Sequence, residues 1–173
     1  MKSKLGIGIL LLAAVFLIFL ALNLIPVKYE IDRSVQGQKW EFDRPEICEE
    51  VTIAIQGEYV KYFLHFFHND YFEGRIMLSG YDFTQSEDSF LYRVNFASRH
   101  YNMGTLAYGS SRGANFPVIG MIFQRTPLEE GVILLNESPE RGENQQVISF
   151  PCQNRKEAAA LADQLLPDGF VYQ

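Results

Sequence analysis

Hydrophobic and polar positions alternate with a period of two along the middle of the chain. In residues 51–56 (VTIAIQ) every second side chain is aliphatic, and in residues 90–97 (FLYRVNFA) every second one is aromatic or aliphatic. Such alternation puts successive side chains on opposite faces of a strand, so both segments are predicted strands. Similar patterns predict further strands at 75–83, 116–124, 132–135, 147–150 and 29–35.

Polar loops separate the predicted strands at intervals typical of antiparallel hairpins. The loops fall at 84–89, 98–102 and 136–146, and Gly37 is predicted to turn the first strand into a second run, QKWEF. Short strands with polar connections favour a mainly β fold, an antiparallel sandwich, roll or partly open barrel. Because no internal repeat or long linker is present, residues 27–173 are predicted to form one β-rich domain.

A helical pattern near the end of the chain predicts one helix over 155–166. Its apolar residues recur at i, i+3, i+4 and i+7, namely Ala158, Leu161, Ala162 and Leu165. Asn154 is the expected N-cap, with Glu157 answering it three residues later, and Pro167 ends the helix. The apolar stripe is expected to pack on the sheet.

The first 26 residues are predicted to be a transmembrane anchor. Residues 5–22 (LGIGILLLAAVFLIFLAL) hold no charged side chain, and about 20 apolar residues span a bilayer as a helix. The alternative is a cleaved signal peptide, whose apolar region is usually shorter, about 7–15 residues, and ends in small residues. Here Ala21 is small, but Phe19 stands two residues before it, so the small-x-small cleavage site is missing. The uncleaved anchor is therefore favoured.

The lysines around this segment predict its orientation. Lys2 and Lys4 precede the apolar run, whereas basic and acidic residues are mixed after it. Positive charge is retained in the cytoplasm. We therefore expect a single-pass protein of the cell membrane with its C-terminal domain extracytoplasmic.

Charge argues against nucleic acid as a partner. The chain carries 15 basic and 21 acidic residues, a net charge of −6, and both Lys2 and Lys4 belong to the anchor. The remaining domain is therefore more acidic still and offers no basic run to a phosphate backbone. At 47% hydrophobic residues the chain is predicted to fold.

The sequence GSSRG at 109–113 fits the G-x-S-x-G pattern of serine hydrolases. That motif requires a strand, a sharp turn at the serine and a helix, with an acid and a histidine later in the chain. The three histidines, at 65, 68 and 100, all precede Ser111, and the residues after it read as a strand. Ser111 is therefore predicted to lie in a hairpin loop. The enzyme alternative is a hydrolase that uses Ser111, or a carboxylate pair such as Glu49–Glu50 or Glu129–Glu130, with His100.

A second candidate for chemistry is HFFHND at 65–70. On a helix, His65 and His68 would share one face and suit a metal ion. Apolar side chains at 60, 62, 64 and 66 instead indicate a strand, on which the two histidines point to opposite faces. Neither a metal site nor a cofactor is predicted, and no residue is assigned a catalytic role.

Cys48 and Cys152, the two cysteines of the chain, are a possible disulfide. Cys48 comes three residues before a predicted strand and Cys152 two residues after another, and antiparallel neighbours bring such positions together. Disulfides persist outside the cytoplasm. The alternative is two free thiols.

The layout resembles that of small membrane-anchored, β-rich proteins of Gram-positive bacteria. The features that carry the resemblance are the N-terminal anchor, VTIAIQGEY at 51–59, YFEGRIMLSGY at 71–81 and NRKEAAALADQL at 154–165. These are core and turn positions, so the resemblance implies an architecture and no activity.

Two functions are consistent with these patterns. The favoured one is a membrane-tethered extracytoplasmic binding or accessory module with a protein or cell-envelope partner. Its candidate contact surfaces are the loop at 109–115 and the aromatic-rich stretch at 59–72. The alternative is the extracytoplasmic hydrolase described above.

Overall fold

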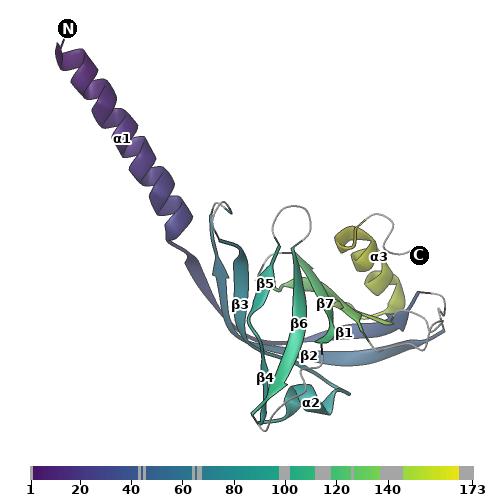
Figure 1. Ribbon diagram of the computed structural model, residues 1–173. Helices are drawn as coiled ribbons and strands as arrows, with labels where there is room; N and C mark the ends of the chain where they lie inside the picture. Colours follow the sequence, from purple (N-terminus) through teal and green to yellow (C-terminus); the bar gives the residue numbers. More distant parts are fainter. Residues whose placement is uncertain are drawn as a thin grey trace.

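Figure 1 shows a computed structural model of the chain, in which strands predominate and helices lie near both ends. The described residues are 2–42, 44, 46–63, 65, 68–97, 102–111, 118–125, 127–136 and 146–167, without the side chains of 2–6 and 23. The elements are α1 (Lys2–Leu24), β1 (Val27–Glu41), β2 (Cys48–Lys61), β3 (Asp70–Leu78), α2 (Asp82–Gln85), β4 (Ser89–Leu91), β5 (Val94–Phe96), β6 (Met103–Ser110), β7 (Val118–Arg125), β8 (Glu130–Leu135), β9 (Gln146–Phe150) and α3 (Arg155–Leu165).

The strands form one antiparallel sheet that curls into a nearly closed barrel. Their order is β4-β6-β7-β8-β9-β1-β2-β3-β5. The two edge strands, β4 and β5, follow each other in the chain, and Ala97 beyond β5 bridges to Met103 on β6. The segment that holds β4 and β5 thus joins the two edges. The predicted mainly β antiparallel fold is confirmed, and the barrel is the form observed.

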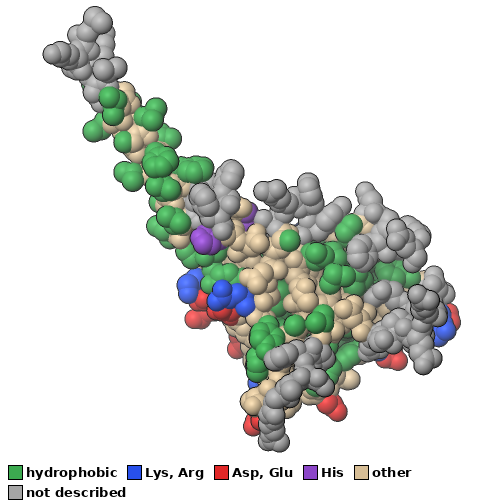
Figure 2. Space-filling view, in the orientation of Figure 1, with side chains coloured by type: hydrophobic (Ala, Val, Ile, Leu, Met, Phe, Trp, Pro, Cys, Tyr) green, Lys and Arg blue, Asp and Glu red, His purple; other side chains and the backbone are tan. Residues whose placement is uncertain are grey.

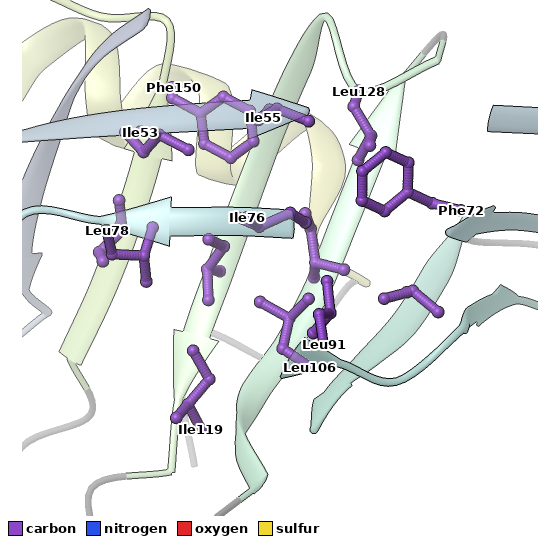
Figure 3. Close-up of a cluster of buried hydrophobic side chains, with 14 of the residues drawn as sticks. Ile53, Ile55, Phe72, Ile76, Leu78, Leu91, Leu106, Ile119, Leu128 and Phe150 are labelled. Atoms are coloured by element: carbon purple, nitrogen blue, oxygen red, sulfur yellow. The ribbon is translucent and has the colours of Figure 1, made fainter. Parts of the chain in front are cut away.

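Alternate side chains of the strands fill the inside of the barrel. From β2 come Ile53 and Ile55, which are fully buried, and from β3 come Ile76 and Leu78. Figure 3 shows these side chains converging with Phe150. Period-two alternation therefore produced the expected inward face, and the middle of the barrel is packed with hydrocarbon.

The predicted turn at Gly37 is wrong, because β1 runs without interruption from Val27 to Glu41. Gly37 lies inside this strand, where a Cβ atom would come within 2.7 Å of the Ile53 Cδ1 atom and of the Ser149 carbonyl oxygen. The glycine is thus required for close approach of neighbouring groups and not for a turn. The run QKWEF continues the same strand up to Glu41.

Gly57 provides a second close approach, between β2 and β3. It pairs in register with Gly74, and its φ of +152° lies in a region that favours glycine. A Cβ atom at Gly57 would lie 2.2 Å from the Glu73 carbonyl oxygen. The pair lets the backbones of β2 and β3 approach closely at this point.

Helix α3 packs on the outer face of the barrel, as the sequence predicted. The Asn154 side chain accepts a hydrogen bond from the Glu157 amide at 3.0 Å, which is the expected N-cap. Ala158 and Ala162 are fully buried, while Leu161 and Leu165 are partly buried. The helix ends at Leu165, one residue before the predicted end.

Helix α1 extends away from the barrel in Figure 1. Its side chains described between residues 7 and 22 are apolar, and most of them are exposed, which Figure 2 shows as a green rod. Over the residues whose side chains are described, no helix is long and apolar enough to cross a membrane.

Candidate functional site

A cavity of about 270 Å³ opens at one end of the barrel. Its walls come from the end of β2, the β2–β3 connection, the start of β3, the residue before β6, and the end of β7 with the turn after it. The lining residues are Tyr59, Lys61, His65, Asp70, Asn102, Gln124 and Pro127. Segments distant in sequence thus place a set of polar side chains around one space.

Asp70 is the centre of a hydrogen-bond network in the cavity wall. Its carboxylate is buried, with 3% of the residue exposed. It accepts hydrogen bonds from the Tyr62 amide at 2.8 Å, from His65 Nε2 at 2.9 Å and from the Tyr59 hydroxyl at 3.3 Å. Three donors compensate the desolvation of the buried carboxylate.

Gln124 extends this network to the β7–β8 turn. Its Nε2 donates to the Tyr59 hydroxyl at 2.9 Å, and its Oε1 accepts from the Leu128 amide at 3.0 Å. Leu128 has a φ of +56°, which is unusual for leucine, and is fully buried. The Gln124 side chain therefore helps to hold a strained turn folded into the end of the barrel.

Tyr59 remains a protonated donor in this network. Burial raises the pKa of its hydroxyl, and the negative charge of Asp70 raises that pKa further. The hydrogen bond from Gln124 lowers the pKa but does not reverse the shift. The hydroxyl can therefore donate to Asp70 across the whole neutral pH range.

The cavity lies at the end of the barrel from which α1 leaves. Lys61, at the cavity, pairs in register with Val27, the first residue of β1 and three residues after the end of α1. Figure 2 shows the histidine side chains, in purple, beside the foot of α1. Ile25 is 67% exposed and Phe63 is 69% exposed, so this end also carries exposed apolar side chains.

The strand predicted from the apolar row at 60–66 is wrong beyond its start, because β2 ends at Lys61. His65 instead joins the Asp70 network, while the His68 ring stacks on Tyr62 with the ring centroids 4.8 Å apart. Among the described residues no group of three or more side chains is placed to hold a metal ion.

Ser111 lies far from the cavity. Its hydroxyl donates to Asp88 Oδ1 at 3.4 Å, beyond the end of β6. Asn102 at the cavity and Ser111 flank opposite ends of that strand, which at about 3.3 Å per residue places them roughly 25–30 Å apart. His100 and residues 112–115 of the loop at 109–115 lie outside the described residues.

The two acidic pairs do not line the cavity. Glu49 and Glu50 are exposed on β2, whereas Glu130 forms an ion pair with Arg125 at 3.3 Å beside the neighbouring Glu129. The carboxylate that the cavity uses is Asp70.

The predicted pairing of Cys48 with Cys152 fails for a topological reason. Both are free thiols, and β2 and β9 are not neighbours, because β1 lies between them. Two strand spacings amount to roughly 9–10 Å, whereas disulfides need Cα atoms within about 7 Å. Cys48 instead donates to Gln38 Oε1 at 3.0 Å, and Cys152 donates to the Ser149 carbonyl at 2.8 Å.

Burial of Cys152 predicts a loss of stability in alkali. Desolvation raises the pKa of its thiol from 9.0 to about 11. Between these values the unfolded chain releases a proton that the folded chain retains, so the free energy of unfolding should fall as pH rises. At about 1.4 kcal/mol per pH unit the loss should reach roughly 2–3 kcal/mol by pH 11.

Denaturant titrations of wild type and Cys152→Ala at several pH values between 8 and 11 measure this effect. The free energy of unfolding of the variant should fall less steeply with pH, even if its value at neutral pH is lower. Equal declines for both proteins would contradict the assignment to Cys152.

Comparisons with known protein families, with curated proteins and with solved structures gave no match. The geometry alone therefore indicates the chemistry. The cavity offers a buried, fully bonded carboxylate, a histidine oriented by it, an exposed lysine and two side-chain amides. This arrangement suits recognition of a small polar group.

Sequence reasoning found only part of this site. The stretch at 59–72 was singled out for its aromatic residues, and it supplies Tyr59, Lys61, His65 and Asp70. Asn102 and Gln124 were missed because they are ordinary polar residues in or beside strands. No local pattern distinguishes a glutamine that faces a cavity from one that faces water.

Proposed function

We propose that the protein is a membrane-tethered extracytoplasmic binding module whose ligand site is the cavity beside α1. The observation that carries the proposal is the cavity itself, where a bonded acidic centre and polar side chains converge at the end of the barrel from which the apolar helix leaves. A small barrel of this kind is wide enough for side chains or one small ligand.

The anchor is supported by the apolar character of α1. Residues 5–22 carry no charge, and the described side chains from Ile7 to Phe19 are exposed around the helix. A long apolar helix whose described side chains are mostly exposed is expected to lie in lipid. Only Ile25 and Pro26 separate α1 from β1, so the barrel would lie directly at the membrane surface.

Protease treatment of protoplasts that express the chain with a C-terminal tag tests this topology. We expect external protease to remove the tag from intact protoplasts, because Lys2 and Lys4 retain the N-terminus in the cytoplasm. Replacing both lysines with glutamate should protect part of the tagged chain, whereas Lys28→Glu should have a smaller effect.

Complete protection of the wild-type tag until lysis would contradict the outward topology. Recovery of the tagged domain in the medium, without α1, would show cleavage in place of anchoring.

A further inference from the structure

We infer that the cavity binds an anionic oxygen group, a phosphate or a carboxylate, carried either by a membrane lipid or by a small soluble molecule. This inference rests on the proposed function, in which the cavity is the ligand site. It follows from counting which polar groups around the cavity are already used and which still have a hydrogen bond to offer.

Among the described lining residues, Asp70 supplies the carboxylate, and it is committed to the protein. Three donors, the Tyr62 amide, His65 and the Tyr59 hydroxyl, bind the Asp70 oxygens, and the carboxylate is almost completely buried. A cationic ligand would have to displace these donors. The negative charge at the site therefore serves to orient His65 and does not invite a cation.

The groups with remaining capacity are mostly donors. Within the described part of the chain, the Lys61 ammonium and the Asn102 side-chain amide have no protein partner, and Gln124 has a second Nε2 hydrogen beyond the one given to Tyr59. His65 gives Nε2 to Asp70, and its second ring nitrogen becomes a donor only when the ring is protonated, as an adjacent anion would favour. Such a set is complementary to oxygen acceptors with negative charge.

Arg33 adds positive charge behind the cavity wall. Its Nη2 donates to the Pro127 carbonyl at 3.1 Å, and Pro127 lines the cavity. Its buried Nε has no partner among the described residues. A guanidinium whose partner among the described residues is a carbonyl and not a carboxylate favours an anion in the adjacent space, although the domain as a whole is acidic.

The dimensions favour a small group or the head of a larger molecule. A volume of about 270 Å³ is below the roughly 300–1,000 Å³ of pockets that enclose drug-sized ligands. Phe63 and Ile25 are largely exposed at the same end of the barrel. An anionic head in the cavity with apolar chains beside these residues is sterically reasonable, and a free anion fits the same donors.

The test uses the full chain in nanodiscs of phosphatidylcholine, with ¹⁵N-labelled histidine observed by NMR. Inorganic phosphate and acetate are the probes, and His65→Gln assigns the His65 signal. We expect one of the anions to shift that signal saturably, with a dissociation constant in the millimolar range or tighter. Lys61→Gln should weaken binding at least about tenfold, because it removes the charge and its hydrogen bond to the anion; tenfold is about 1.4 kcal/mol.

Lys28→Gln is the matched control. Lys28 is also an exposed lysine at this end of the sheet, but it pairs with Glu58 at 2.8 Å and does not line the cavity. This variant should bind the anion as wild type does. The relative response to phosphate and acetate identifies the preferred group.

Nanodiscs that contain phosphatidylglycerol distinguish the two sources. If the His65 signal is already shifted there and added phosphate binds more weakly, the ligand is a lipid headgroup; an unchanged response indicates a soluble anion. Absence of a saturable shift with both probes, or equal affinity in Lys61→Gln, would overturn the inference. The protease experiment is independent, so failure of the topology would leave a positive anion titration standing.

Discussion

Replacing Asp70 with alanine should lower the free energy of unfolding by roughly 2–6 kcal/mol. The change leaves the buried Tyr59 hydroxyl and the half-buried Tyr62 amide without this acceptor, and an unsatisfied donor costs about 1–3 kcal/mol when it is buried. His65 also loses the bond that orients its ring. Denaturant unfolding followed by the fluorescence of Trp40, the sole tryptophan, measures the loss.

Two further variants separate the loss of the hydrogen-bond acceptor from the loss of a carboxylate charge. Asp70→Asn retains an acceptor oxygen of the same shape, so we expect it to lose clearly less stability than Asp70→Ala. Asp32→Ala removes an exposed carboxylate that accepts one bond from Gln56, and it should change stability by no more than about 0.5 kcal/mol. A loss below about 1 kcal/mol for Asp70→Ala would show that the network is dispensable for folding.

Local patterns were sufficient for the elements whose burial follows a simple period. The alternation at 51–56 lies within β2, and the stripe and cap of α3 were both found. The failures have a common cause in tertiary contact. Gly37 lies inside a strand at a position where Ile53 and the Ser149 carbonyl leave no space for a Cβ atom, which is a feature of packing and not of the chain nearby.

The site was harder to predict than the fold. In the stretch after Lys61 the apolar row suggested a strand, yet the chain turns so that His65 can reach Asp70. Asn102, the residue before β6, and Gln124 on β7 line the same cavity, and these segments meet β2 only through closure of the barrel. The disulfide between Cys48 and Cys152 was wrongly predicted for the same reason, because the strand order decides whether two strand ends are neighbours.

Replacing Trp40 with alanine should lower the free energy of unfolding by about 3–5 kcal/mol, as for other large buried aromatic residues. Trp40 is 2% exposed on the outer face of the sheet, within the apolar cluster that α3 covers. Its Nε1 donates to the Ser149 hydroxyl at 3.0 Å. The Arg155 guanidinium lies over the indole, 3.8 Å from its centroid, at the first residue of α3.

The contacts of Arg155 predict that the attachment of α3 weakens before the barrel does. Arg155 also donates to the Glu41 carbonyl at 3.2 Å, so the start of α3 is attached to β1 at two points. Arg155→Ala should cost about 1 kcal/mol or somewhat more, because a cation–π contact contributes about 0.5–2 kcal/mol. Trp40→Phe retains much of the apolar area and should fall between the two.

Circular dichroism during denaturation measures these losses in chains that lack tryptophan, and hydrogen exchange reports their location. In Trp40→Ala, hydrogen exchange should accelerate more for the amides of α3 than for those of β2. The helix loses an aromatic side chain that it packs against, while the barrel interior keeps Ile53 and Ile55. Phe63→Ala, which removes an aromatic side chain that is 69% exposed, is the matched control and should leave both measurements nearly unchanged. Uniform acceleration over α3 and β2 in Trp40→Ala would mean that the helix and the barrel unfold as one unit, and that Trp40 stabilises the whole domain and not the attachment of α3 alone.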